Sequence, residues 1–433
     1  MKRLLTITLA FNLLFLVNAS TKPDGETRTA VVTRQVSVND LINIKAKYTE
    51  LVIETWDKDE IEITATVRYD GKMTDKMTEF LQEFQEQVEN KIIDSSGEIL
   101  IDTDLDRPNK VQIGSKRVGI NIGFSEDEFK LDYKIKAPAR SSYEISSSYR
   151  DVSMIGKFEK VKLTQYSGEL TADYIAEADL DMKYGSSNFK EIGKATMEIY
   201  EQELEAITIG DLEINTKYSE LEIDKITSME AVSYESDFVI EFIGSLSGNY
   251  KYGELEIKEN LGDAELAFYE MDIDAKNAGN IKFEQSKYGK IKFDEVKSLN
   301  FLQSYEDNLT IGRLGDFRSI SSKYAKHNIQ TLSGSFMLNA YEDDIRIYQV
   351  AESTSEIDID GKYINAIVDL SPVPFSFYSN VKYGKVDYNE SDVDIKKYIK
   401  ESDQLEVELR SKNASSTSMQ VRVKGYEIDV VLK

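Results

Sequence analysis

The sequence contains no cysteine, one histidine and only five prolines among its 433 residues. Without cysteine, the chain has no disulfide, no cysteine-based metal site and no lipid-attachment cysteine of a bacterial lipoprotein. The histidine, His327, stands in KYAKHNI at a position that we interpret as inward-facing and packed. We therefore expect no Ser-His-Asp or Cys-His nucleophile and no zinc site. The scarcity of proline suits long stretches of regular backbone hydrogen bonding.

Long apolar runs are also missing beyond Ser20. Residues 4–17 are mainly apolar, follow Lys2 and Arg3, and lead into the small-residue end Val17-Asn18-Ala19. This pattern predicts a secretory signal peptide at 1–19, cleaved after Ala19. A membrane anchor is the weaker alternative, because the run is short and contains polar residues. We expect no membrane span after signal removal.

Positive charge is in short supply. The net charge is −25, and loss of Lys2 and Arg3 with the signal peptide makes it −27. This balance disfavours nucleic acid and anionic membrane surfaces as partners, and favours divalent cations or basic partners. The hydrophobic share of 41% is high enough to bury a core. We expect an exported protein of the periplasm, cell surface or extracellular space.

A tyrosine recurs through the middle of the chain at nearly equal intervals of roughly 16 to 19 residues. Two phrases alternate around it: K-Y-G/S, as in KYGELEI at Tyr252, and Y-E, as in FYEMDI at Tyr269. Repetition at a fixed period indicates stacked supersecondary units. The tyrosines are Tyr149, Tyr166, Tyr184, Tyr200, Tyr218, Tyr234, Tyr252, Tyr269, Tyr288, Tyr305, Tyr324 and Tyr341.

Each phrase carries the period-two pattern of a short strand. Apolar residues follow Tyr252 at Leu255 and Ile257, and follow Tyr234 at Phe238 and Ile240. Strands this short must stack to bury their apolar face, so we predict an all-β fold, a parallel β-helix or β-solenoid. One rung would hold about 17–18 residues, or about 35 with a tyrosine at two corners. The tyrosines would then form one or two ladders.

The rest of the chain divides around this repeat. We predict a polar leader at 20–40, N-terminal strands at 41–142 with one amphipathic helix at 72–92 as a cap, and solenoid repeats at 143–390. Residues 391–433 would form a charged link, compatible with a helix, and a capping hairpin of QLEVELRS and SMQVRVKGYEIDVVL.

The phrases KYTELVIETWDKDEIEI, YKIKAPARSSYEISSSYRDVSM and KYGELEI, behind a signal peptide, resemble the putative-adhesin family of exported β-helical proteins from Bacteroidetes, related to head-GIN domain proteins. The resemblance covers roughly residues 38–390. It implies a right-handed parallel β-helix on the outer side of the inner membrane. It carries no catalytic signature.

Carboxylates are too plentiful for pairs of them to indicate a site. Asp102-Thr-Asp104-Leu-Asp106 imitates the start of a calcium loop, but Arg107 stands where that loop needs glycine, and Ile113 where it needs glutamate. We interpret it as a solvated acidic turn. Asp343, Asp344 and Arg346 are the one compact cluster of catalytic type, and they match ordinary repeat residues. We expect no enzyme, no catalytic, cofactor or metal residues, and no cofactor.

The Y-E phrases also place a glutamate in each unit. Equivalent rung positions would stack these acids into a column of like charge, bridged by cations or interleaved with the lysines of the K-Y-G/S phrases. The two sets are Glu201, Glu235, Glu270, Glu306 and Glu342, and Lys183, Lys217, Lys251, Lys287 and Lys323.

From these patterns we expect a non-catalytic, adhesin-like or envelope scaffold protein whose repetitive surface binds a protein or polysaccharide of the cell envelope or surface. The alternative is a carbohydrate-binding or carbohydrate-active β-helix protein. Tyrosines that point inward would favour the scaffold. Tyrosines that lie outward beside an acidic face would favour the alternative.

Overall fold

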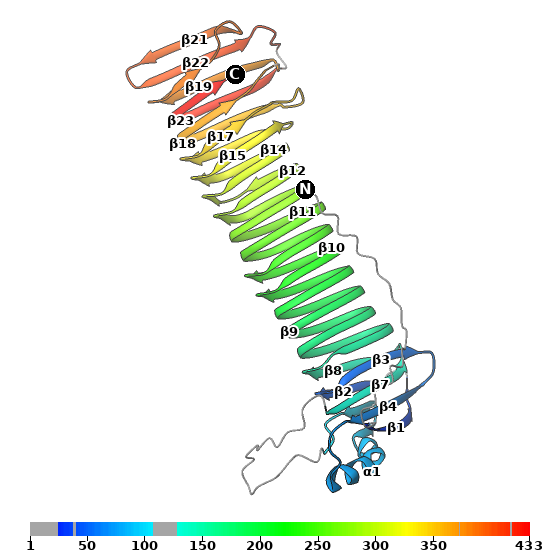
Figure 1. Ribbon diagram of the computed structural model, residues 1–433. Coiled ribbons are helices and arrows are strands. Elements are labelled where there is room, and N and C mark those ends of the chain that lie inside the picture. Colours follow the sequence, from blue (N-terminus) through cyan, green and yellow to red (C-terminus); the bar gives the residue numbers. More distant parts are fainter. Residues whose placement is uncertain (1–24, 38–39, 107–127, 372, 416–417) are drawn as a thin grey trace, which may run out of the picture.

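The chain forms a long rod of stacked coils (Figure 1). The computed structural model describes residues 25–37, 40–106, 128–371, 373–415 and 418–433. The predicted signal peptide at 1–19, and Arg107 and Ile113 of the acidic loop, lie outside these ranges. Within the described ranges, no helix is both long and apolar enough to cross a membrane.

The coils pair in parallel, each with the coil before and after it. Glu220 pairs with Glu203 on one side and with Asp237 on the other, so the repeat here is about 17 residues. Lys290 pairs with Asp272 and with Asn308, so the repeat there is about 18 residues. Each coil therefore carries one tyrosine. The shorter predicted rung is confirmed, and the longer alternative with a tyrosine at two corners is wrong.

Two of the strands of the rod, β9 (Val152–Lys217) and β11 (Asp237–Lys287), run through several coils without a break, and the others each span one coil or part of one. The others are β8 (Ser142–Ser148), β10 (Glu220–Tyr234), β12 (Lys290–Phe301), β13 (Ser304–Tyr305), β14 (Asn308–Lys323), β15 (Lys326–Leu332), β16 (Phe336–Tyr341), β17 (Asp344–Ile347) and β18 (Glu356–Val368).

The core lies inside the coils and is built from stacked equivalent positions. In β10, Leu221, Ile223 and Met229 are buried, while Glu220 and Glu222 are exposed. Parallel pairing in register places each buried side chain over its counterpart about 4.8 Å away. One interior column consists of phenylalanines with ring centroids 4.6 to 5.9 Å apart: Phe283, Phe301, Phe317 and Phe336.

The N-terminal end is built by strands that come back into the stack out of chain order. β2 pairs in parallel with β6 on one side and β8 on the other, and β3 pairs likewise with β7 and β9. The strands here are β1 (Glu26–Gln35), β2 (Leu41–Lys47), β3 (Glu50–Trp56), β4 (Glu60–Tyr69), β5 (Ile92–Ser95), β6 (Glu98–Asp102) and β7 (Phe129–Pro138).

The segment predicted as a polar leader, 20–40, contains strand β1 instead. β1 pairs antiparallel with β4 along its full length, from Glu26 opposite Tyr69 to Gln35 opposite Glu60. Only Ala30 and Val32 within β1 are buried. A strand with one small buried face has a weak apolar pattern, which is why the sequence alone suggested a leader.

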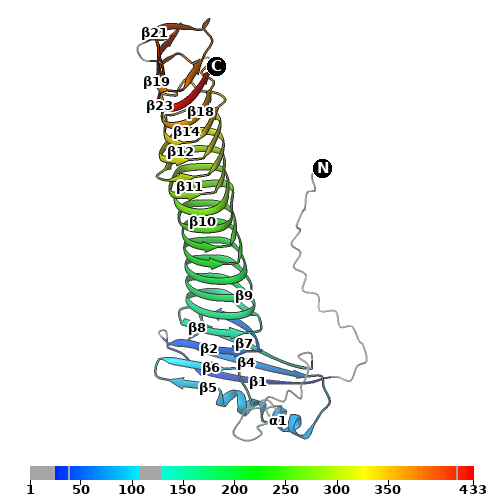
Figure 2. The same cartoon turned by 90° about the vertical axis from the view of Figure 1, so that its left-hand side faces the viewer.

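The helix α1 (Asp75–Asn90) covers this end of the rod (Figure 2). It lies within the predicted 72–92. The Thr74 side chain caps it by accepting a hydrogen bond from the Met77 N–H. Its apolar face is buried, and Gln85 bonds the backbone of Val31 in β1. The buried residues are Met77, Phe80, Leu81, Phe84 and Val88.

The C-terminal end differs from the predicted link and hairpin. The supposed link contains strand β21, and β22 pairs antiparallel with β21 and β19, not with β23. β23 instead lies in parallel between β18 and β19, so the last strand forms an inner coil. The strands are β19 (Phe375–Lys382), β20 (Lys385–Asp387), β21 (Val393–Glu401), β22 (Gln404–Ser411) and β23 (Met419–Leu432).

We predict that Gly425→Val weakens the pairing of β23 with its neighbouring strands and destabilises the protein. Gly425 has φ +140°, and a Cβ there would lie 1.9 Å from the Gly361 carbonyl oxygen. The strained backbone and the clash should cost about 1 to 3 kcal/mol and lower the melting temperature measured by circular dichroism. Limited proteolysis should cut the variant near its C-terminus. Lys424→Val, at an exposed neighbour, is the control; equal melting temperatures for both variants would contradict the prediction.

Candidate functional site

Sixteen tyrosines form one continuous ladder along an edge of the rod. Neighbouring ring centroids are 4.9 to 5.7 Å apart. In spatial order the ladder consists of Tyr48, Tyr149, Tyr166, Tyr184, Tyr200, Tyr218, Tyr234, Tyr252, Tyr269, Tyr288, Tyr305, Tyr324, Tyr341, Tyr363, Tyr426 and Tyr383.

The ladder follows a sharp backbone corner that is more regular than the tyrosines themselves. One non-glycine residue per coil has positive φ there, at a constant interval from Ser167 to Tyr252 and at an interval one residue longer from Tyr252 to Glu342. In K-Y coils this residue is the tyrosine, as at Tyr218 (φ 56°). In Y-E coils it is the next residue, as at Glu235 (φ 47°). The two phrases therefore differ by a shift of the tyrosine by one residue.

The shift decides how the rings pack. Where K-Y and Y-E coils alternate, successive rings meet edge to face, with interplanar angles of 64° to 83°. Tyr48 and Tyr149 both hold the positive-φ position, and their rings stack at 11°. The ring quadrupole favours edge-to-face or offset contact over a face-to-face sandwich, and such pairs contribute about 0.5 to 1.5 kcal/mol beyond burial.

The rings lie outside the core. Tyr218 is 44% exposed and Tyr363 is 39% exposed, close to the value for most K-Y tyrosines. The predicted ladder is thus present as a single column, but it faces outward. The outward placement agrees with the carbohydrate-binding or carbohydrate-active alternative and not with the inward ladder expected of the scaffold.

Lysines flank one side of the ladder and glutamates the other. Tyr234 of a Y-E coil pairs with Lys217 and Lys251 of the K-Y coils on either side. One residue further along the chain, Glu235 lies beside Tyr218 and Tyr252 of the neighbouring coils. Two lysines of one column, or two glutamates of the other, are therefore two coils apart, about 9.5 Å, with a tyrosine between them. The glutamates do not stack on adjacent rungs, because the phrases alternate; the rungs between them carry the lysines, one position along, which agrees with the interleaved alternative.

Beyond the glutamates, one sheet face is strongly acidic. Five successive coils carry a carboxylate at the same position, at about 4.8 Å spacing, and at one end of this row Lys290 bonds Asp272 at 2.8 Å. The five are Glu203, Glu220, Asp237, Glu254 and Asp272. Among the described residues, no group of three acids or histidines is placed to hold a metal ion.

The acidic turn predicted from Asp102, Asp104 and Asp106 has partners of its own. The Asp102 carboxylate accepts a hydrogen bond from the Asp104 N–H at 2.9 Å and lies 3.7 Å from the Lys91 ammonium. Asp106 is exposed. The three side chains do not converge.

The predicted packed position of His327 is confirmed, and its partner is one of the suspected catalytic acids. His327 Nε2 lies 3.0 Å from Asp343 Oδ2, and both side chains are buried. Asp343 also accepts hydrogen bonds from the Ser322 hydroxyl at 2.5 Å and the Ala325 N–H at 3.0 Å. The aspartate thus joins neighbouring coils at the inside of the tyrosine corner.

Asp344 and Arg346 point the other way. Both are exposed on β17, where Asp344 Oδ1 accepts a hydrogen bond from Asn365 at 3.1 Å. The cluster of three suspected from sequence is thereby split between core and surface, because alternate strand residues face opposite sides. Asp307, two coils before Asp343, plays the same inner role: it accepts from Gly289 N–H at 2.9 Å. Burial raises the pKa of Asp307.

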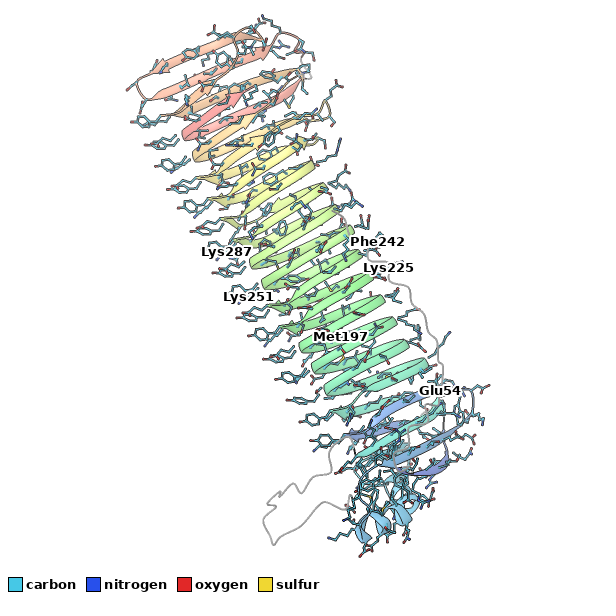
Figure 3. All side chains as sticks on the ribbon, in the orientation of Figure 1. Glu54, Met197, Lys225, Phe242, Lys251 and Lys287 are labelled. Carbon is cyan, nitrogen blue, oxygen red and sulfur yellow. The ribbon has the colours of Figure 1, made fainter. Side chains whose placement is uncertain are left out.

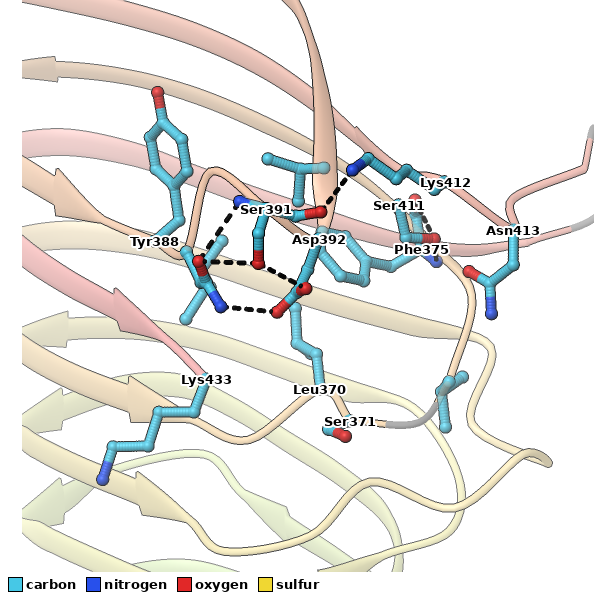
Figure 4. A pocket seen from close by; sticks show the side chains of 14 residues that line it. Leu370, Ser371, Phe375, Tyr388, Ser391, Asp392, Ser411, Lys412, Asn413 and Lys433 are labelled. Carbon is cyan, nitrogen blue, oxygen red and sulfur yellow. Dashed lines mark hydrogen bonds between the residues drawn. The ribbon is translucent and has the colours of Figure 1, made fainter.

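Three of the shallow hollows on the surface bear on a binding site. One of about 300 Å³ lies at the C-terminal end, where Asn389 and Ser391 each donate a hydrogen bond of 2.8 Å to Asp392 (Figure 4). Its central polar groups are thus bonded to one another. The other two, of about 320 and 440 Å³, lie beside the ladder on its lysine side, at Tyr269 and at Tyr341.

Beyond the twelve tyrosines identified from the sequence repeat, four more join the ladder: Tyr48, Tyr363, Tyr383 and Tyr426. K-Y phrases at Tyr363 and Tyr383 follow each other without a Y-E phrase between them. The GYEIDV phrase at Tyr426 supplies the missing Y-E phrase. The Tyr426 ring packs between the rings of Tyr363 and Tyr383, at centroid distances of 5.7 and 5.4 Å. Strict alternation could therefore have placed the C-terminal strand. Tyr48 opens the ladder from the KYTELVI phrase.

We predict that Asp343→Ala destabilises the rod and Asp344→Ala does not. The first change leaves buried donors of Ser322 and Ala325 without an acceptor, at about 1 to 3 kcal/mol each. The second removes an exposed bond. Urea denaturation of both variants checks this, and equal midpoints would show that the buried aspartate contributes nothing special.

We predict that the Y-E tyrosines ionise at a higher pH than ordinary tyrosines do. A hydrogen bond to the adjacent glutamate raises the pKa of Tyr200, Tyr234, Tyr305 and Tyr341 above the ordinary 10.0. Because the folded-state pKa is raised, the stability that these bonds contribute is complete below about pH 10 and is lost as pH rises through the raised values.

Changing the four adjacent glutamates to glutamine should let the tyrosines ionise at lower pH in an ultraviolet titration of tyrosinate. Changing four acids of the acidic face instead removes the same charge and should leave the titration close to that of the unchanged chain. A similar shift in both sets would mean that overall charge is responsible. The first set is Glu201, Glu235, Glu306 and Glu342; the control set is Glu203, Glu220, Asp237 and Glu254.

Comparison with known proteins leaves the function to be inferred from these residues. No known protein-family pattern matches the chain, and no curated protein matches it. One solved structure, described as a "putative cell adhesion protein" from Clostridium sporogenes, is similar at 9% identity over 95% of this chain and 100% of its own, with a TM-score of 0.19. A similarity of that size carries no argument about function.

Proposed function

We propose that this protein is a non-catalytic, exported, adhesin-like β-solenoid that binds an extended polymer along its tyrosine ladder. The observation that carries the proposal is the outward position of the ladder: the tyrosines of most K-Y coils, such as Tyr184 at 41%, are exposed, and those of the Y-E coils are half-buried. An aromatic column needed only for stability could be buried, as the phenylalanine column is. Repeated aromatic rings at a fixed spacing suit a ligand that also repeats.

The mechanism would be summation of weak contacts. Each coil offers one ring and one charged side chain, and a polymer that contacts several coils gains from the high effective concentration of the next site. The parallel pairing between coils holds the rings in place before binding, which lowers the ordering cost.

The resemblance to the putative-adhesin family and the predicted signal peptide support export to the periplasm, cell surface or extracellular space. The right-handed sense of the coils rests on the same resemblance. The net charge of −25 argues against nucleic acid as the partner. The partner would be a polysaccharide or protein of the envelope or surface.

The second candidate function is an envelope scaffold, in which the ladder only stiffens the rod. The regular edge-to-face packing favours it. A carbohydrate-active enzyme is less favoured, since of the candidate acids Asp343 is buried and Asp344 is exposed.

We predict that Tyr252→Ala with Tyr269→Ala abolishes retention on a polymer identified by screening the full chain against a glycan array. Removing two neighbouring rings interrupts the stacking surface. Phe242→Ala is the control: like the two changes at the half-buried tyrosines it removes a ring from the surface, but Phe242 (45% exposed) lies on the opposite edge of the rod (Figure 3).

Retention should be lost for the tyrosine variant and kept for the control, with circular dichroism showing that both remain folded. If no glycan is retained by the unchanged chain, or if the tyrosine variant binds as well as the control, the scaffold becomes the better proposal.

A further inference from the structure

The hollow beside Tyr269 has an unusual charge for this protein. It is lined by two lysines and no carboxylate, in a chain of net charge −25. One wall holds Lys251, Tyr269 and Lys287, from three successive coils. Figure 3 shows Lys251 and Lys287 on the same edge of the rod. The small side chain of Ala267 leaves the space of about 320 Å³ open.

The lysine and amide side chains that line this hollow form no bond to other side chains within the described ranges. Lys251 and Lys287 form no ion pair with any described residue, whereas Lys282 on the same coil as Lys287 bonds Glu265 at 2.9 Å. Asn249 and Gln285 line the opposite side of the hollow, are exposed, and likewise have no hydrogen-bond partner for their side chains within the described ranges.

This combination has a clear chemical preference. Ammonium groups bind carboxylates, amide side chains bind hydroxyls, and tyrosine rings pack against the apolar face of a sugar ring. A peptide strand would need a free sheet edge for pairing, and here the backbone groups are already paired with neighbouring coils. A sugar chain needs only side chains.

The spacing of the lysines also limits the ligand. Tyr305 and Tyr341 each pair in register between two lysines, so the column reads Lys, Tyr, Lys, Tyr, with about 9.5 Å between lysines. Duplex DNA carries a charge about every 1.7 Å and would find too few cations here. A polymer with one carboxylate in every second sugar presents charges far more sparsely.

We propose that the lysine side of the tyrosine ladder binds an acidic, uronate-type polysaccharide running along the rod, with the hollow at Tyr269 as its best-formed site. The inference rests on the proposed function and names its ligand class. The hollow beside Tyr341 extends the same track, with Lys323 and Lys362 on its wall, and with one carboxylate, Asp360, in its lining. The Tyr269 site is therefore the stronger of the two.

The test uses the full chain and two matched probes in calorimetric titrations: hyaluronan oligosaccharides, which carry one carboxylate in every second sugar, and the same oligosaccharides with their carboxyl groups methyl-esterified. The free acid should bind more tightly than the ester, and added salt should weaken the binding. Lys251→Gln with Lys287→Gln should weaken it by about tenfold. Lys225→Gln with Lys297→Gln, at the opposite corner, should leave it unchanged.

Equal binding of both probes, or unchanged binding by the Lys251 and Lys287 variant, overturns the inference. If the ester binds and Tyr252→Ala with Tyr269→Ala removes that binding, the ladder is still a polymer site and the proposed function stands without its charge preference. Absence of binding by oligogalacturonate, alginate and hyaluronan also overturns the inference, while a neutral hit on the glycan array would keep the proposed function.

Discussion

The whole structure depends on parallel backbone pairing between coils in register. This pairing fixes the rise at about 4.8 Å and places every side chain over its equivalents above and below. Any residue type favoured at one position is then repeated as a column, whether it is apolar, aromatic or charged. Apolar columns fill the core, and the positive-φ corner, which recurs once in each coil, keeps the columns aligned.

Stacking of identical residues on coils so close together would create two problems at the corner, and the alternation of the two phrases avoids both. Identical rings directly above one another would be held face to face, and identical charges would repel. The alternation of K-Y and Y-E phrases moves the ring by one residue on each coil. Rings then meet edge to face, and lysines such as Lys251 and glutamates such as Glu235 fall into separate columns with a tyrosine between like charges.

The ends of the rod are closed by chain segments that are distant in sequence. β2 and β3 lie inside the stack next to β8 and β9, and β23 lies between β18 and β19. Each insertion ties a terminal segment between two neighbours and leaves antiparallel strands to form the outer layer. At the N-terminal end, α1 also covers that layer. Such closure limits the exposed edges on which another chain could pair.

The sequence by itself determined the all-β fold, the spacing of the tyrosines and the existence of a tyrosine ladder, because these follow from local periodicity; that one coil spans a single tyrosine interval was decided by the pairing between coils. It also indicated that His327 is packed. Only the tertiary structure decided that the rings face outward, that Asp343 is buried while Asp344 is exposed, and that Tyr426 belongs between Tyr363 and Tyr383. Those outcomes depend on which strands become neighbours, and pairing between segments far apart in the chain leaves little trace in local pattern.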